Sequence, residues 1–251
     1  MKILVSNDDG INAHGIKVLE KIAHELSDDV YIVAPERDQS CVSHSLTLRN
    51  PLRIRQISEK KFAVDGTPTD CVLLAVHEVF NGKKPDLLLS GVNYGGNIAE
   101  DISYSGTVAA AIEGAMLGIP SFALSLIYDP GHPAKWATAE NHAPHLIRTI
   151  LHQGVPKNTL ININFPNVIS SSVKGVAITE QGHRGDDVRL HENFDPRGDK
   201  YYWVGPIDYH VSGPAGTDLE AIANKKISIT PLSIRLTHRP TLRKLKEIFV
   251  G

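Results

Sequence analysis

Short apolar runs alternate with longer amphipathic segments along most of the chain. Residues 3–5 and 30–34 are rich in Val, Ile and Leu without interruption, which is typical of strands buried on both faces. Between them, residues 15–26 place apolar side chains at helical spacing with charged residues in the gaps. This alternation predicts a doubly wound α/β fold, a mostly parallel sheet flanked by helices. The further expected strands are 46–64 (two or three short ones), 85–90, 121–126, 160–165, 176–179 and 227–230, and the further expected helices are 68–79, 108–117, 134–153 and a short one from Thr217.

Local signals mark where two of these helices begin or break. Thr67 and Asp70 have the spacing of a capping box, with Pro68 at the first helical position. Pro144 lies inside the segment 134–153, so we expect it to kink or divide that helix.

Residues 182–216 break the alternating pattern, because they are rich in Gly, Asp, Arg and Pro and contain little core-forming sequence. The segments 188–194 and 200–204 flank an Asp-Pro-Arg-Gly turn, which predicts a projecting β-hairpin arm. An isolated hairpin is marginally stable in water, so we expect the arm to pack on another subunit. We therefore predict a single α/β domain over 1–251, with 182–216 as an oligomerisation arm and 240–250 as a C-terminal helix.

The composition narrows the class of partner. The 251 residues carry a net charge of −2 from 26 basic and 28 acidic residues. The sequence contains no block of basic residues, which argues against nucleic acid as the main partner. The two cysteines, Cys41 and Cys71, exclude a disulfide framework. The chain enters its first strand at once, and no apolar run reaches membrane-spanning length. We therefore expect a cytoplasmic protein with no membrane partner and no nucleic acid partner.

The first strand ends on two adjacent carboxylates, Asp8 and Asp9, followed by Gly10. Two ionised carboxylates about 4 Å apart repel by about 4 kcal/mol at an effective dielectric near 20. Such a pair must therefore meet water, share a proton or bind a cation. Ligands of open α/β sheets bind at the carboxyl ends of the strands, so we expect a divalent cation at this point.

Other oxygen donors follow neighbouring strands and are expected at the same edge of the sheet. Ser40 follows the second strand, and Asn93 and Asn97 lie in a glycine-rich loop after the strand 85–90. Carboxylate, amide and hydroxyl oxygens suit Mg²⁺, Mn²⁺ or Ca²⁺ better than Zn²⁺. The sequence contains no zinc-binding cysteine pair or HExxH helix.

The tripeptide Ser105, Gly106 and Thr107 opens an alanine-rich helix and offers a phosphate site at the positive helix end. Taken alone, the tripeptide is better explained by Thr107 as a plain N-cap with nothing bound. Beside a carboxylate pair and a glycine-rich loop, the ligand interpretation is favoured. The residues therefore indicate metal-dependent hydrolysis of a phosphate ester, in which a cation on Asp8 and Asp9 polarises the phosphoryl oxygen and activates a water molecule.

His44 lies near Ser40, and histidine is the side chain that most often transfers protons in catalysis, which makes it a candidate general acid for the leaving group. A supporting polar role in the same loop explains it as well, and we favour that role.

Together these motifs resemble the SurE family of survival-protein nucleotidases. The resemblance covers nearly the whole chain. The matching motifs are Asn7-Asp8-Asp9-Gly10, Ala34-Pro35 with Ser40, Gly66 to Cys71, Ser90 to Asn93 with Asn97, Tyr104 to Thr107, Asp195 to Gly198, Tyr202 to Gly205, Gly216 to Asp218 and Ile227 to Leu232.

The resemblance implies a Rossmann-like fold, a cytoplasmic dimer or tetramer with exchanged C-terminal elements, and a divalent-metal phosphatase. The implied substrates are nucleoside 5′- and 3′-monophosphates, with some action on short polyphosphate. The implied roles, by position, are metal ligation by Asp8, Asp9, Ser40 and Asn93, with the Asp pair catalytic, and phosphate binding by Asn97, Ser105, Gly106 and Thr107. This chain departs from the family pattern at Cys41, where glycine is usual, and at Gly96, where proline commonly stands.

Two other interpretations of the site remain open at this point. In one of them, the protein is a phosphatase in which Asp8 or Asp9 attacks the phosphate as a nucleophile and forms an aspartyl-phosphate. In the other, the protein is a nucleotide-binding and metal-binding regulatory module that turns nothing over.

Overall fold

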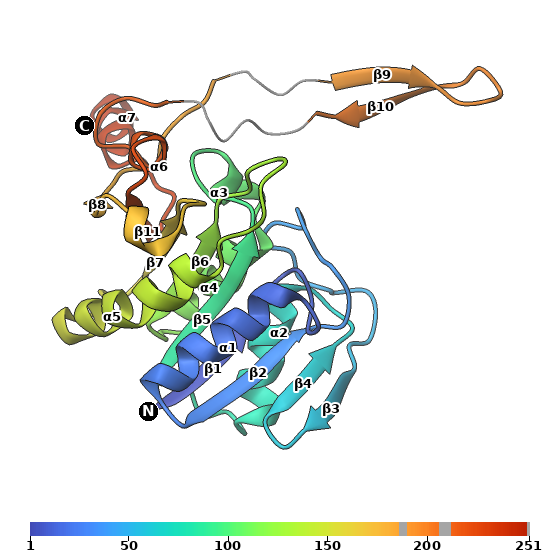
Figure 1. Cartoon of the computed structure of the whole chain (residues 1–251), viewed down its shortest axis with the longest axis vertical. Helices are drawn as coiled ribbons and strands as arrows, with labels where there is room; N and C mark the ends of the chain where they lie inside the picture. Colours follow the sequence, from blue (N-terminus) through green and yellow to red (C-terminus); the bar gives the residue numbers. More distant parts are fainter. Residues whose placement is uncertain (186–189, 206–211, 250–251) are drawn as a thin grey trace.

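The structure is a computed structural model that describes residues 1–185, 190–205 and 212–249. Within these residues, nine strands form one sheet in the order β3-β4-β2-β1-β5-β6-β7-β11-β8 (Figure 1). All neighbours are parallel except the pairs β3–β4 and β7–β11. The strands of this sheet are β1 (Lys2–Ser6), β2 (Asp29–Pro35), β3 (Ile54–Ser58), β4 (Lys61–Val64), β5 (Leu87–Tyr94), β6 (Ser121–Leu126), β7 (Thr159–Phe165), β8 (Val176–Ile178) and β11 (Ile227–Ser233).

Helices cover both faces of this sheet, as the alternating sequence predicts. One face packs against α1 (His14–Leu26) and α5 (Ala137–Gln153), and the other against α2 (Pro68–Leu74) and α4 (Gly106–Met116) (Figure 1). The central strands are buried on both sides, which explains their uninterrupted apolar sequence. The mostly parallel α/β fold is confirmed. The assignment of residues 1–251 to a single domain stays a prediction.

The order of the strands creates a switch point between β1 and β5. From β1 the chain runs outward through β2 to β4, and it then returns to place β5 on the other side of β1. Ligands of doubly wound sheets bind at the carboxyl ends of the strands at such a switch point. This is where Asp8 and Asp9 follow β1, and where Asn93 lies at the end of β5.

Three local features differ from the sequence-based expectation. Pro144 does not divide α5, which runs unbroken over 17 residues with the proline ring buried against the core, so packing outweighs the lost hydrogen bond. The segment expected as a loop after Ser90 is partly strand, because β5 continues to Tyr94 across a register shift between Ser90 and Asn93. The helix from Pro68 ends at Leu74 and continues as a π-helical turn, Ala75–Val79.

A short helix, α3 (Asp101–Tyr104), lies between β5 and α4. The later part of the chain contains a 3₁₀ turn (Ser170–Ser172), α6 (Asp218–Ala223) and α7 (Arg239–Phe249). The predicted C-terminal helix 240–250 agrees with α7, apart from residue 250, which lies outside the described residues. Within the described residues, no helix is both long and apolar enough to cross a membrane. The cytoplasmic location stays a prediction.

The hairpin arm consists of β9 (Leu190–Phe194) and β10 (Lys200–Val204), which pair in antiparallel register and extend away from the main sheet (Figure 1). The turn between them is closed by the Asp195 carboxylate, which accepts hydrogen bonds from the N–H groups of Arg197 and Asp199 at 2.8 and 2.9 Å. The predicted hairpin is therefore present. Residues 186–189 and 206–211 of the predicted arm lie outside the described residues.

Candidate metal and phosphate site

The turn after β1 brings Asp8 and Asp9 to the carboxyl edge of the sheet. The Asn7 side-chain amide donates to the Gly10 carbonyl at 3.0 Å, and Ile11 N–H donates to Pro35 at 2.8 Å. Gly10 has φ +98°, a left-handed conformation that glycine adopts without strain. The glycine therefore permits the turn that presents both carboxylates.

The Asp8 carboxylate is held against the first turn of α4. It is only 4% exposed, and the Thr107 hydroxyl donates to its Oδ1 at 2.5 Å. A Cβ built on Gly106 would lie 2.7 Å from the Asp8 Cβ, so only glycine fits beside this side chain. Burial raises the pKa of Asp8, and the hydrogen bonds from Thr107 oppose that rise.

Asp9 is half-buried beside Asp8, and its environment disfavours a negative charge. Burial is the largest cause, followed by the charges of Asp8 and Asp38, and together they raise the pKa of Asp9 from 3.8 to about 7. The backbone N–H of Tyr94 acts in the opposite sense. Asp9 therefore lies in the field of two other carboxylates, and no cationic side chain is among the groups that shift its pKa.

The raised pKa of Asp9 predicts how the stability of the metal-free protein depends on pH. Between about pH 4 and pH 7 the folded chain holds a proton on Asp9 that the unfolded chain has released. The free energy of unfolding should therefore fall as the pH rises through this window. We expect Asp9→Asn to weaken this fall, measured by thermal unfolding in EDTA from pH 4.5 to 8. An identical pH dependence in the two proteins would show that Asp9 ionises normally.

Ser40 is tied to the carboxylate pair through its own loop. Its hydroxyl donates to Asp38 Oδ1 at 2.6 Å and its N–H to the same oxygen at 2.8 Å, while Gln39 N–H donates to the Asp8 carbonyl at 2.8 Å. Sequence reasoning missed Asp38. The Asp-x-Ser spacing is the signature of an Asx turn and could have revealed it.

Asn93 approaches the same point from β5. Its side-chain amide nitrogen donates a hydrogen bond to the Gly95 carbonyl at 2.9 Å. The amide oxygen, Oδ1, takes no part in that bond. No hydrogen bond reaches this oxygen from the residues that the structure describes. Asn93 Oδ1 is therefore available to a ligand.

The start of α4 differs from the expected arrangement in one respect. The N-cap is Ser105, whose hydroxyl accepts a hydrogen bond from Val108 N–H at 3.0 Å, and not Thr107. Thr107 instead directs both its hydroxyl and its backbone N–H at Asp8. The positive end of α4 thus already stabilises one carboxylate of the pair.

Asn97 is buried farther along the sheet edge, toward β6 and β7. Its amide nitrogen donates to Ser125 Oγ at 2.7 Å, and its backbone is held by the side chains of Asn162 and Asn164. Within the described residues no hydrogen bond joins Asn97 to Asp8 or Asp9. The structure thus groups Asp8, Asp9, Ser40, Asn93 and Thr107 at one edge and places Asn97 beside this group.

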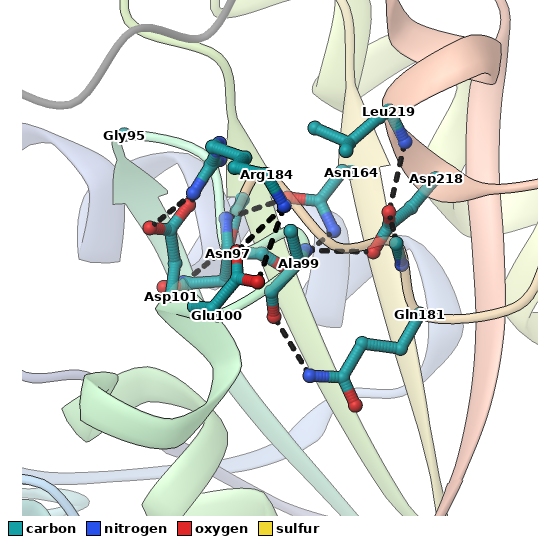
Figure 2. Close-up of polar contacts among 12 residues, drawn as sticks. Gly95, Asn97, Ala99, Glu100, Asp101, Asn164, Gln181, Arg184, Asp218 and Leu219 are labelled. Carbon is teal, nitrogen blue, oxygen red and sulfur yellow. Dashed lines mark hydrogen bonds and ion pairs between the residues drawn. The ribbon is translucent and has the colours of Figure 1, made fainter. Parts of the chain in front are cut away.

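The loop that carries Asn97 is linked by hydrogen bonds and an ion pair to the first residues of the arm, 182–184. Asp101 and Arg184, both buried, form a two-pronged ion pair of 2.7 and 2.8 Å (Figure 2). Asp218 accepts hydrogen bonds from the N–H groups of Ala99 and Gly182 at 2.9 and 2.8 Å (Figure 2). The arm and the site loop therefore share one polar anchor, which sequence reasoning did not find.

His44 points away from the start of α4. Its Nε2 lies 2.9 Å from Glu113 Oε2, seven residues and about 10 Å along the helix from Gly106. Ser43 secures the same loop by donating to the carbonyls of Ser103 and Tyr104. This geometry favours the supporting role of His44 over that of a general acid.

The donor set fits a hard, oxygen-preferring cation. The described residues contain no group of three or more His, Cys, Asp or Glu side chains that could hold a metal ion. Two carboxylates, a hydroxyl and an amide oxygen lie outside that definition, and they are the donor types that Mg²⁺ and Mn²⁺ accept.

Comparison with known proteins identifies the family. The family described as Survival protein SurE matches residues 3–187. A protein named 5′-nucleotidase SurE from Paramagnetospirillum magneticum is 54% identical over 249 residues, covering 99% of this chain and 96% of that protein. One of the same name from Methylocella silvestris is 54% identical over 250 residues, covering 98% and 99%. The crystal structure of the Sure protein from Aquifex aeolicus has a TM-score of 0.87 and 38% identity, covering 99% of both chains. This chain belongs to the SurE family.

Proposed function

We propose that this protein, a 5′-nucleotidase, hydrolyses nucleoside 5′- and 3′-monophosphates to nucleoside and phosphate, using one divalent cation, Mg²⁺ or Mn²⁺. Asp8, Asp9, Ser40 and Asn93 would ligate the cation. The observation that carries the proposal is the convergence of Asp8 and Asp9 at the switch point of the sheet, with the pKa of each raised. A bound divalent cation would favour the ionised form of both.

The four donors are compatible with one cation. Asn93 Oδ1 accepts no hydrogen bond from the described residues, and Ser40 Oγ gives its proton to Asp38, which leaves its lone pairs for a ligand. Asp8 uses Oδ1 for Thr107, so Oδ2 can turn to the cation. When bound, such a cation polarises a phosphoryl oxygen and lowers the pKa of a water molecule.

The remaining residues would bind and orient the phosphate. Ser105, Gly106 and Thr107 form the first turn of α4, where the helix end favours a negatively charged group. Asn97, which is buried in the loop after β5, would also contact the phosphate. Thr107 keeps Asp8 in place through its hydroxyl, so the same turn would serve both the carboxylate and the substrate.

Phosphate release from purified full-length protein tests this function. The protein is stripped with EDTA, reloaded with Mg²⁺ or Mn²⁺ and assayed with 5′-AMP, 3′-AMP, tripolyphosphate and, as a diester control, 3′,5′-cyclic AMP. We expect metal-dependent release from both monophosphates, some from tripolyphosphate and none from the diester. Absence of release with either metal would overturn the proposal in favour of a regulatory module. A pre-steady-state burst of nucleoside would point to an aspartyl-phosphate in place of direct attack by water.

We further propose that the arm joins copies of this chain into a dimer or tetramer. The hairpin arm exposes six large apolar side chains, which are Leu190, Phe194, Tyr201, Tyr202, Trp203 and Val204. A two-stranded hairpin with this much exposed apolar surface is expected to pack against a partner surface.

A double charge substitution in the arm should dissociate this assembly. Phe194 and Trp203 are 58% and 65% exposed, so Glu at both positions leaves the fold of the subunit intact. We expect a smaller species in sedimentation velocity, because an interface does not bury two unpaired carboxylates. The control is Ile57→Glu, at a 44% exposed position on the edge strand β3, which should change nothing. An unchanged sedimentation coefficient in the arm variant would exclude the arm from the interface.

A further inference from the structure

A row of four aromatic rings passes next to the candidate cation ligands. The ring centroids are 5.3 Å apart for His14 and Trp136, 5.6 Å for Trp136 and Tyr94, and 5.1 Å for Tyr94 and Tyr128. Tyr94 directly follows Asn93 on β5, and its backbone N–H acts on the Asp9 carboxylate. The backbone of Tyr94 therefore joins the row to the edge of the sheet that carries the carboxylate pair. The proposed phosphate chemistry does not use the row.

The two tyrosines at the outer end of the row are open to a ligand. Tyr94 is 42% and Tyr128 is 38% exposed, and their rings meet edge to face at 85°, so neither ring face is fully covered by the other. Together the two rings form an exposed aromatic surface at the edge of the sheet where Tyr94 N–H meets Asp9. A flat π system that stacks on them would bury this surface.

The backbone beneath the rings is fixed. Gly95 N–H donates to the Leu126 carbonyl at 2.9 Å and Ile127 N–H donates to Phe165 at 3.0 Å, so the ends of β5 and β6 hold Tyr94 and Tyr128 in register. On the inner side, α1 approaches β5 so closely that a Cβ on Gly15 would lie 1.9 Å from the Val92 oxygen. The backbone that carries the rings is thus held in place, so it loses little conformational entropy when a ligand stacks on them.

We propose that Tyr94 and Tyr128, supported by Trp136 and His14, are the binding site for the base of the nucleotide. This inference rests on the proposed function, because a nucleoside monophosphate carries an aromatic base one ribose away from the phosphate. Stacking accepts any base, since every base has a π face, and it gains most from the larger purines. The tyrosines would therefore set the preference for nucleotides over base-free sugar phosphates.

Paired substrates test the role of the rings in the full-length, metal-loaded protein. The substrates are 5′-AMP and ribose 5-phosphate, which share the sugar and phosphate and differ in the base. In Tyr94→Ala and Tyr128→Ala, we expect the ratio of kcat/KM for AMP to that for ribose 5-phosphate to fall about tenfold, mainly through KM for AMP. Tyr94→Phe keeps the ring and should retain most of the ratio. An unchanged ratio in the alanine variants would overturn the proposal.

A binding measurement separates this inference from the proposed function. The chain has two tryptophans, so Trp203→Phe leaves Trp136 as the only tryptophan reporter. We expect adenosine to quench its fluorescence saturably without metal, and Tyr94→Ala in the same background to weaken that binding about tenfold. Absence of quenching, or equal quenching in both proteins, contradicts the base site even if AMP is hydrolysed. Conversely, quenching without any phosphate release retains the base site and overturns the hydrolase. A changed sedimentation coefficient in Tyr94→Ala would instead assign the rings to a subunit interface and overturn the inference.

Discussion

Asp8→Asn is expected to reduce phosphate release from 5′-AMP by about 10³-fold or more with either Mg²⁺ or Mn²⁺, without loss of folded protein. The amide has the size of the carboxylate, and its oxygen can still accept the Thr107 hydroxyl bond. The substitution therefore removes one charge, and it replaces one accepting oxygen by an NH₂ group that can only donate. Losing a charge that stabilises the cation and the transferring phosphoryl group costs far more than losing a neutral contact.

Stability should change in the opposite sense to activity. Burial raises the pKa of Asp8, which means that its ionised form is costly in the metal-free fold. A neutral amide avoids this cost, so the melting temperature in EDTA should be equal to or above that of the wild type. Mn²⁺ should raise the melting temperature of the wild type and have little effect on the variant, because binding stabilises only the protein that binds.

Asp28→Asn is the matched control, since Asp28 is exposed in the turn before β2, distant in sequence from every candidate ligand. It should leave activity and the Mn²⁺ response unchanged. Activity near the wild-type level in Asp8→Asn would remove Asp8 from the proposed metal site.

The general fold could be predicted from the sequence because its strands and helices differ in hydrophobic period. Uninterrupted apolar runs of about four to eight residues that are rich in Val and Ile are typical of strands covered on both faces, and their alternation with helices favours a parallel sheet. The errors lie where tertiary packing outweighs local preference. Pro144 lies inside an unbroken α5 with its side chain buried, and β5 continues past Ser90 because pairing with β6 resumes at Asn93.

The candidate site could be predicted in part, because a parallel sheet brings the carboxyl ends of its strands to one edge. That argument placed the Asp pair beside Asn93 and the start of α4. It could not assign hydrogen bonds between residues far apart in sequence. The bond from Thr107 to Asp8 spans 99 residues, and the ion pair of Asp101 with Arg184 spans 83. Such partners depend on the exact positions of side chains that no local pattern specifies.

The second large effect is expected from a single methyl group at Gly106. A Cβ there would lie 2.7 Å from the Asp8 Cβ and 3.0 Å from its Oδ2, closer than real contacts allow. Asp8 cannot simply move aside, because Thr107 holds its carboxylate and Gln39 N–H holds its carbonyl. We therefore expect Gly106→Ala to displace the carboxylate and lower kcat for AMP by about 10²-fold, the scale that a misplacement of about 1 Å produces.

A control in the same helix distinguishes displacement of Asp8 from general strain. A Cβ on Gly114, two turns farther along α4, would lie 2.4 Å from Ser121 Oγ and 3.2 Å from a Leu88 methyl group. Both glycine-to-alanine changes should lower the free energy of unfolding by about 1–3 kcal/mol, the cost of overpacking, measured by urea denaturation. Only Gly106→Ala should lose activity per folded molecule, because only its methyl group meets Asp8. Equal losses of activity in the two variants would mean that strain in α4, and not the position of the Asp8 carboxylate, limits the reaction.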